Sequence, residues 1–313
     1  MTRALVFPGQ GSQAVGMGKE LAEAFPVARE VFQEIDDALS QKLSALMFEG
    51  PENELTLTEN AQPALMAVSL AVTRVLENEG GFTLTDKCDL VAGHSLGEYS
   101  ALAAAGTFAV ADTARLLKIR GQAMQAAVPV GVGAMAALLG LDFADAVAVA
   151  EEAAQGEVCT AANDNANGQV VVSGHKAAVE RAIEIAKEKG AKRAVLLPVS
   201  APFHCSLMQP AADRMAEALA EVAMNAPGKP VVANVTAEKT DNPETIRKLL
   251  VEQVCGTVRW RESVLYMKTQ GITDLVEIGA GKVLTGMVRR IDRDLTGTSV
   301  NGPADIEAFL GTL

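Results

Sequence analysis

The pentapeptide Gly93-His94-Ser95-Leu96-Gly97 constrains the fold of this chain more than any other segment. It follows the apolar run Cys88–Ala92 and precedes Glu98–Ala105, whose alanine-rich pattern indicates a helix. A G-x-S-x-G turn between a strand and a helix is typical of a nucleophile elbow, where a serine hydroxyl projects from a sharp turn. A Gly-rich connection with a chance serine is the alternative, and the flanking strand and helix disfavour it. The pattern predicts an α/β fold with Ser95 as a nucleophile.

Composition excludes several classes of protein. The 313 residues are 49% hydrophobic and 21% charged, enough for a sizeable core in one or two domains. The net charge of −12 argues against nucleic acid as a partner. Residues 1–10 lack the pattern of a secretory signal, and no run of about 18 apolar residues occurs, so we expect a cytoplasmic protein with no membrane partner. Four scattered cysteines support neither a metal site nor disulfide bonds.

Strand and helix patterns alternate up to residue 129 and again after residue 198, which indicates a mostly parallel sheet covered by helices. The intervening segment has a different order, βαββαβ, which is that of the ferredoxin-like split unit. Its strands are expected at 134–140, 158–162, 169–173 and 191–199, and its helices at 143–154 and 175–189. We therefore predict a hydrolase-like α/β domain from residues 1–129 and 199–313, with a small ferredoxin-like subdomain, 130–198, inserted into it.

A serine nucleophile needs a base, usually histidine, and the chain has three histidines. His94 adjoins Ser95 on a turn where neighbouring side chains diverge, and His175 opens a helix of the small subdomain. His204 lies in a proline-flanked loop after a strand, where α/β enzymes place active-site groups, and we choose it as the base. No Asp or Glu between Ser95 and His204 follows a later core strand. Either the triad is unconventional, or something other than a carboxylate orients His204.

Longer motifs link the chain to a known family. They are Phe7–Gln13, Gly16–Gly18, Gln62–Leu65, Gly93–Tyr99, Arg120-Gly121, Gly168–Gly174, Pro198–His204 and Glu277–Gly279. With these motifs in this order, the chain resembles the malonyl-CoA:acyl-carrier-protein transacylases and the acyltransferase domains of polyketide and fatty-acid synthases. The resemblance implies a hydrolase-like fold with a ferredoxin-like insert. It also implies a stand-alone enzyme that moves a malonyl group from malonyl-CoA to the phosphopantetheine thiol of acyl carrier protein by ping-pong kinetics, without a cofactor or metal.

The resemblance also implies roles for particular residues. Ser95 is the acylated nucleophile and His204 its base. The N–H groups of Leu96 and Gln10 form the oxyanion hole. A main-chain carbonyl near Gln253 orients the histidine, which would explain the missing carboxylate.

Further roles concern the substrate and the partner. Arg120 grips the malonyl carboxylate; by helix pattern alone it would be a surface residue, but its planar fork suits a carboxylate. The resemblance also implies that Phe203 narrows the pocket against an α-methyl group; a core aromatic on a loop is the alternative. Because acyl carrier proteins and this chain are both acidic, we expect a local basic docking patch, with Lys192-Arg193 and Arg289-Arg290 as candidates. Ordinary solvated charges are the alternative for these pairs.

Two rival functions stay open from the sequence. A serine hydrolase would share the elbow but would have no use for a buried cation at Arg120. A non-catalytic scaffold of the same fold is disfavoured because Ser95, His204, Gln10 and Arg120 occur together.

Overall fold

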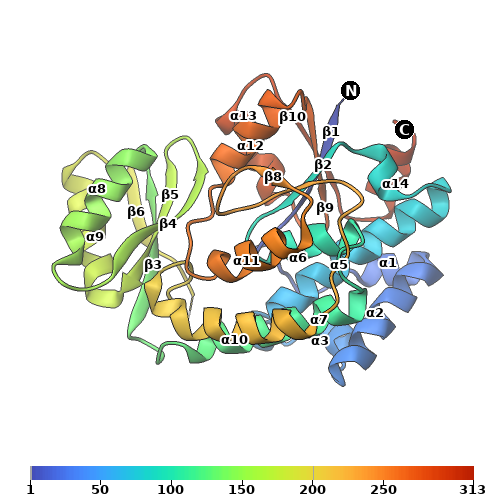
Figure 1. Cartoon of the computed structure of the whole chain (residues 1–313), viewed down its shortest axis with the longest axis horizontal. Helices are drawn as coiled ribbons and strands as arrows, with labels where there is room; N and C mark the ends of the chain where they lie inside the picture. Colours follow the sequence, from blue (N-terminus) through green and yellow to red (C-terminus); the bar gives the residue numbers. More distant parts are fainter. Residues whose placement is uncertain (1, 200) are drawn as a thin grey trace.

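Two separate sheets organise the chain in the computed structural model, which describes residues 2–199 and 201–313 (Figure 1). The larger sheet has the strand order β10-β9-β1-β2-β7-β8. Its strands are β1 (Arg3–Phe7), β2 (Leu90–Gly93), β7 (Val231–Val232), β8 (Lys239–Thr240), β9 (Asp274–Ile278) and β10 (Thr296–Val300). All run parallel except the edge strand β8, which pairs antiparallel with β7. The predicted mostly parallel sheet is confirmed.

Helices cover both faces of this sheet, because its strands carry apolar side chains on both faces. Leu5, Phe7 and Val91 pack into the core formed with α5 and its neighbours, whereas Ala4 and Val6 pack into a second core with α12 and α13. The helices of this part are α1 (Lys19–Ala24), α2 (Pro26–Leu39), α3 (Leu43–Glu49), α4 (Glu52–Leu55), α5 (Thr58–Gly80), α6 (Leu96–Ala104), α7 (Val110–Ala126), α10 (Gln209–Glu221), α11 (Pro243–Gln253), α12 (Trp260–Thr269), α13 (Val283–Ile291) and α14 (Pro303–Leu310). Two short 3₁₀ turns, Leu84–Lys87 and Ser206–Met208, complete the order.

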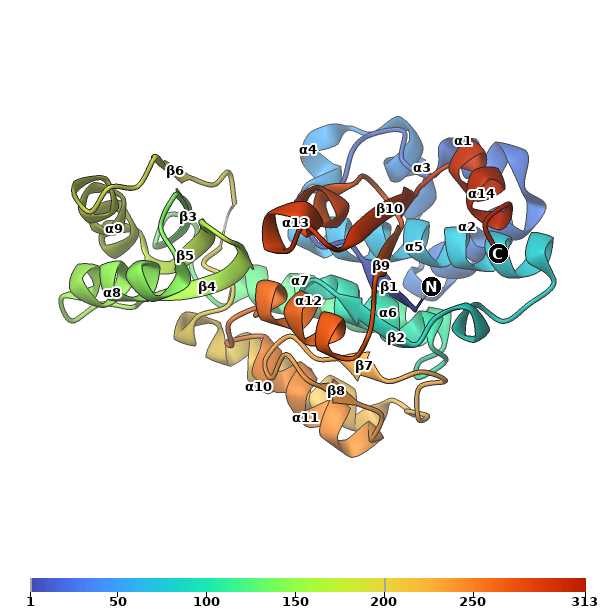
Figure 2. The same cartoon turned by 90° about the horizontal axis from the view of Figure 1, so that it is seen from above.

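The smaller sheet lies at one end of the molecule in both views (Figures 1 and 2). Its strands are β3 (Gly133–Leu139), β4 (Cys159–Ala166), β5 (Gln169–His175) and β6 (Arg193–Leu196), with helices α8 (Phe143–Ala154) and α9 (Lys176–Glu188) between them. The order β4-β5-β3-β6, antiparallel throughout, is that of two interleaved β-α-β units. The ferredoxin-like architecture is confirmed. The domain boundaries at 129/130 and 198/199 stay predictions.

Strand β4 attaches the small sheet to the segment that precedes α12. The Val258 N–H donates to the Ala162 carbonyl at 2.9 Å, and the Asp164 N–H donates to the Val258 carbonyl at 2.9 Å. The buried Asp164 carboxylate also pairs with Arg261 of α12 at 2.9 Å. Register shifts at two places in β4 bend the strand here, which brings Asn163 and Asn165 to the wall of a cavity between the sheets.

Some elements differ from the sequence-based expectation. Strand β7 ends at Val232, because the next residues turn toward Ser95. The strand expected at 158–162 continues to Ala166 through its two irregularities. Strand β10 and helix α14 were not anticipated, since three of the five β10 residues are exposed and the strand lacks an apolar run. Ser200, within the Pro198–His204 motif, lies outside the described residues.

Candidate active site

Ser95 occupies a strained turn between β2 and α6. Its backbone angles are φ 54° and ψ −112°, in a region that residues with a side chain rarely adopt. Both flanking glycines are required by close approach: a Cβ on Gly93 would lie 1.9 Å from the carbonyl carbon of Gly97, and one on Gly97 would lie 2.2 Å from the Phe7 oxygen. The turn therefore has the tight strand–turn–helix geometry that the sequence predicts.

His204 reaches Ser95 from the segment that follows β6. Its Nε2 lies 2.8 Å from Ser95 Oγ, and its Nδ1 lies 2.9 Å from the main-chain oxygen of Gln253. A carbonyl only accepts hydrogen bonds, so Nδ1 carries the proton and Nε2 is free to accept from the serine hydroxyl. Burial, and secondarily the Arg120 charge, lowers the pKa of His204 to about 3. The imidazole is thus neutral at ordinary pH.

Arg120 lies beside the serine although it comes from the middle of α7. Its side chain is 1% exposed. Nη2 donates to Ser95 Oγ at 3.1 Å and to Gln253 Oε1 at 2.9 Å, and Nη1 donates to Gln62 Oε1 at 2.8 Å. Among residues 2–199 and 201–313 no carboxylate lies within ion-pair distance of this guanidinium. The site therefore holds a buried cation whose direct partners are neutral.

These groups line one cavity of about 520 Å³ between the two sheets. Gln10 and Leu96 lie in its wall next to the serine, and Phe203, 8% exposed, lies beside His204. Asn165 closes another wall through a 2.8 Å hydrogen bond with His94. A serine hydroxyl, a neutral imidazole and a guanidinium thus face one space, and that arrangement could serve transfer of an anionic acyl group.

Comparisons with known proteins agree with this geometry. The family model of the acyl transferase domain matches residues 4–302. The malonyl CoA-acyl carrier protein transacylase of Escherichia coli K12 is 50% identical over 307 residues, 98% of each chain. The acyl-carrier-protein-S-malonyltransferase of Bartonella henselae has a TM-score of 0.97 at 58% identity, covering 100% of this chain and 99% of that one. A malonyl-transacylase in complex with a type II PKS acyl-carrier protein has a TM-score of 0.96 at 46% identity, over 100% of both chains.

The chain belongs to the acyl transferase family. Its relatives match it along almost their whole length, and the resemblance to malonyl-CoA:acyl-carrier-protein transacylases is confirmed. The roles of the individual residues stay predictions. The structure adds the contacts that these residues make with one another.

Asn234 is a site residue that the sequence did not reveal. Its Oδ1 accepts from the Ser95 N–H at 2.8 Å, and its Nδ2 donates to the Gly93 carbonyl at 2.7 Å. One fully buried amide thus fixes the backbone on both sides of the strained turn. The one available signal was an asparagine just after a short buried strand, a pattern too common to single it out.

Gln253 ends α11 and contacts most of the site. In addition to its carbonyl on His204 and its Oε1 on Arg120, its Nε2 donates to the Ser95 carbonyl at 2.9 Å and to Glu98 Oε2 at 2.8 Å. The residue was expected to contribute a main-chain carbonyl only. Its side chain, fully buried, joins the cation, the elbow and a carboxylate.

The two basic pairs lie around one turn of the small sheet. Lys192 and Arg193 are exposed at the start of β6, and Arg289 and Arg290 are exposed at the end of α13. Contacts connect them through the β4–β5 turn: Asn167 Nδ2 donates to the Arg290 carbonyl at 2.8 Å, and the Gly140 N–H donates to the Gly168 carbonyl at 2.8 Å. The Lys192 N–H in turn donates to the carbonyl of Leu139, the residue before Gly140, at 2.8 Å.

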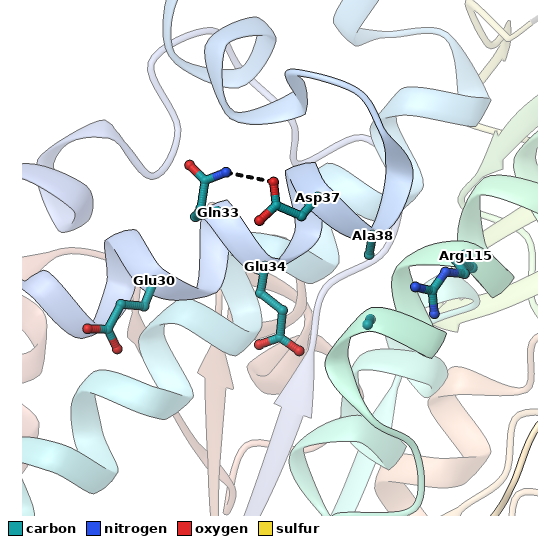
Figure 3. Close-up of a pocket in the computed structure, with 7 residues that line it drawn as sticks. Glu30, Gln33, Glu34, Asp37, Ala38 and Arg115 are labelled. Atoms are coloured by element: carbon teal, nitrogen blue, oxygen red, sulfur yellow. Dashed lines mark hydrogen bonds between the residues drawn. The ribbon is translucent and has the colours of Figure 1, made fainter.

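A second hollow, about 570 Å³, lies on the outer surface between α2 and α7 (Figure 3). Three of its seven lining residues are acidic (Glu30, Glu34 and Asp37), Arg115 lies at one end, and it shares no residue with the Ser95 cavity. In the described parts of the chain, no cluster of three or more His, Cys, Asp or Glu is placed to bind a metal ion. None of the helices described has the length and apolar character needed to cross a bilayer.

Asn234→Ala should loosen the elbow. It leaves the Ser95 N–H and the Gly93 carbonyl without partners, at about 1–3 kcal/mol for each unsatisfied group. We expect the free energy of unfolding to fall by about 2–6 kcal/mol in urea titrations. Asn225→Ala is the matched control, since Asn225 is exposed and its amide makes one long contact, 3.5 Å, to the Gly106 carbonyl. Equal stability of the two variants would contradict the role of Asn234 in holding the turn.

Proposed function

We propose that this protein transfers a malonyl group from malonyl-CoA to the phosphopantetheine thiol of an acyl carrier protein, through a malonyl ester of Ser95. The observation that carries the proposal is the buried Arg120 guanidinium, 3.1 Å from the nucleophilic oxygen and without a carboxylate partner among the described residues. A buried unpaired charge is costly, and an acyl group that brings its own carboxylate would neutralise it. The relatives named above carry the same activity in their names.

In the first half-reaction, Ser95 Oγ gives its proton to His204 Nε2 and attacks the thioester carbonyl carbon. The carbonyl oxygen becomes an oxyanion, for which the main-chain N–H groups of Leu96, at the start of α6, and Gln10 are the proposed donors. When the tetrahedral intermediate collapses, the C–S bond breaks and His204 passes its proton to the departing CoA sulfur. The product is the malonyl ester of Ser95 and free CoA.

The second half-reaction runs the same steps with another thiol. The pantetheine S–H gives its proton to His204, the sulfur attacks the ester carbonyl, and Ser95 Oγ leaves and recovers the proton. One neutral histidine therefore serves both halves in a ping-pong cycle. Malonyl-CoA is a substrate here, and the proposed steps use no cofactor. Such a reaction fits fatty-acid or polyketide elongation in the cytoplasm.

Phe203 is proposed to set the width of the acyl site. It is almost fully buried in the cavity wall next to His204. An α-methyl group on the acyl chain would need the space that the ring fills. We expect methylmalonyl-CoA to acylate the protein more slowly than malonyl-CoA, and Phe203→Ser to reduce the difference.

Intact-protein mass spectrometry tests the function directly. Brief incubation with malonyl-CoA should add one malonyl group, located on Ser95 by peptide mapping, and acyl carrier protein should remove it. Ser95→Ala should abolish both the adduct and the transfer. Loss of the adduct to water at the same rate with or without carrier protein would indicate a serine hydrolase. An adduct on Cys205 would refute the proposed nucleophile.

Arg120→Ala should reduce selectivity for a carboxylated acyl group. A charge-assisted hydrogen bond contributes about 1.5–3 kcal/mol, which corresponds to roughly a 10- to 150-fold loss of kcat/KM for malonyl-CoA. The kcat/KM for acetyl-CoA should change little. Arg115→Ala is the control from the same helix, because Arg115 is exposed and pairs with Asp112 at 3.0 Å. An equal loss on both donors would mean that Arg120 is structural.

We propose further that the carrier protein docks on the basic surface around the β4–β5 turn. Two net-negative proteins repel at long range, so a productive encounter needs cations near the cavity. The contacts that join Lys192 to Arg290 through the turn support one continuous surface. Strand β6 then leads from Arg193 to Leu197, which lines the cavity.

Charge reversal should disrupt this docking selectively. Lys192→Glu with Arg193→Glu should raise KM for the carrier protein and leave transfer to free pantetheine unchanged. The difference should shrink at high salt, because exposed charges are screened beyond about 8–10 Å at physiological ionic strength. Arg214→Glu with Lys248→Glu makes the same charge change on α10 and α11 as a control. Unchanged KM in the first double variant would remove this pair from the docking surface.

A further inference from the structure

Glu98 is a buried carboxylate that the proposed mechanism does not use. It lies one turn after Ser95 on α6 and is 0% exposed. Its Oε2 accepts from the Asn234 N–H at 3.0 Å and from Gln253 Nε2 at 2.8 Å, whereas its Oε1 has no hydrogen-bond partner in the described structure. An acidic group with one unsatisfied oxygen so close to the nucleophile needs an explanation, because burial of such a group is costly.

The side chain of Gln253 connects this carboxylate to Arg120. Its Nε2 donates to Glu98 at 2.8 Å, and its Oε1 accepts from Arg120 Nη2 at 2.9 Å. The dipole of one amide is thus oriented with its positive end on the anion and its negative end on the cation. Glu98 and Arg120 do not touch, so the Nη1 and Nη2 edge of the guanidinium keeps only neutral partners.

Apart from the Arg120 guanidinium, the titratable groups around Glu98 are neutral near pH 7. Burial raises the pKa of Tyr99, the next residue on α6, to about 12. Burial lowers the pKa of His94 in the elbow, and lowers that of His204 to about 3. Burial raises the pKa of Glu98 to about 7, against the effects of its two hydrogen-bond donors and of Arg120 on α7. Both protonation states of Glu98 are therefore accessible under working conditions.

We propose that Glu98, acting through Gln253, is the counter-ion of Arg120 in the resting enzyme, and that it takes up a proton from solvent when an acyl carboxylate occupies Arg120. This inference rests on the proposed function. Without the proton, the closed site would hold two carboxylates and one guanidinium in a medium of low dielectric constant. Glu98 is thus a positioning residue that sets selectivity through the cation, and it does not contact the reacting atoms.

The proposal predicts how selectivity depends on pH. Below about pH 7 Glu98 is neutral, and the full charge of Arg120 is available to the substrate. Above this pH Glu98 is ionised, and it competes with the acyl carboxylate for the charge of Arg120. The ratio of kcat/KM for malonyl-CoA to that for acetyl-CoA should therefore fall as pH rises through this range. Titrations that affect both donors equally cancel in the ratio.

Glu98→Gln tests this with the hydrogen bonds preserved, since one amide oxygen can accept from both Asn234 and Gln253. The ratio should become independent of pH and, at pH 8.5, exceed that of the wild type by about 5-fold or more, the low end of coupling between two sites. Glu277→Gln is the matched control: Glu277 is equally buried but accepts from the Leu284 and Thr285 N–H groups at the start of α13. It should leave the wild-type slope unchanged.

Proton uptake by the wild-type protein gives a second measurement, independent of any variant. Acylation of Ser95 is proton-neutral, because the serine proton ends on the CoA thiol. In weak buffer with an indicator dye, malonyl-CoA should cause proton uptake by the protein, and the uptake should increase as pH rises through the range in which Glu98 ionises. Acetyl-CoA, which brings no carboxylate, should cause none.

The outcomes separate this inference from the function on which it rests. Absence of a malonyl adduct on Ser95 would defeat the proposed function itself. An adduct that forms with no difference in proton uptake between the two donors would overturn the role of Glu98 alone, as would identical pH slopes for the wild type and Glu98→Gln. Uptake with malonyl-CoA only, even if Glu98→Gln failed to fold, would support it.

Discussion

The hydrogen bonds of Gln253 hold the parts of this site together. Its main-chain oxygen fixes the tautomer of His204, and its side chain bridges Arg120, the Ser95 carbonyl and Glu98. Base, cation and elbow come from three distant segments of the chain, so none is positioned by its neighbours in sequence. Because α11 ends at this residue, a change in the packing of that helix would move all three at once.

The cavity depends equally on the attachment of the small sheet. Both the N–H and the carbonyl of Val258 form hydrogen bonds with β4, and the Asp164–Arg261 ion pair reinforces the same attachment. Loss of Arg261 would leave the buried Asp164 carboxylate without its cation, which is strongly destabilising. The irregular β4 is thereby held where Asn165 meets His94. One wall of the cavity is therefore formed by β4, an edge strand of the small sheet. Val258 of the larger part of the chain supplies hydrogen bonds that the small sheet does not.

Local sequence patterns were sufficient to predict the elbow, the order of elements in the small sheet, and which of the three histidines contacts Ser95. Arg120 required the family resemblance, because a cation within an ordinary helix pattern gives no sign of burial. Asn234 could not be predicted, since it meets the Ser95 N–H across 139 positions of the chain. The partner of His204 was obscure for a different reason: a main-chain carbonyl is present at every residue and leaves no trace in the choice of side chain.

That carbonyl has a consequence for which acyl groups the site can accept. A triad acid in its place would put a full negative charge next to His204, on the residue that also touches Arg120. The guanidinium would then have a permanent ionic partner, and an incoming anion would have to displace it. A dipole orients the imidazole without occupying the cation. The use of a main-chain carbonyl in place of an acidic third member of the triad is therefore a condition for recognising a charged acyl chain next to the serine that it esterifies.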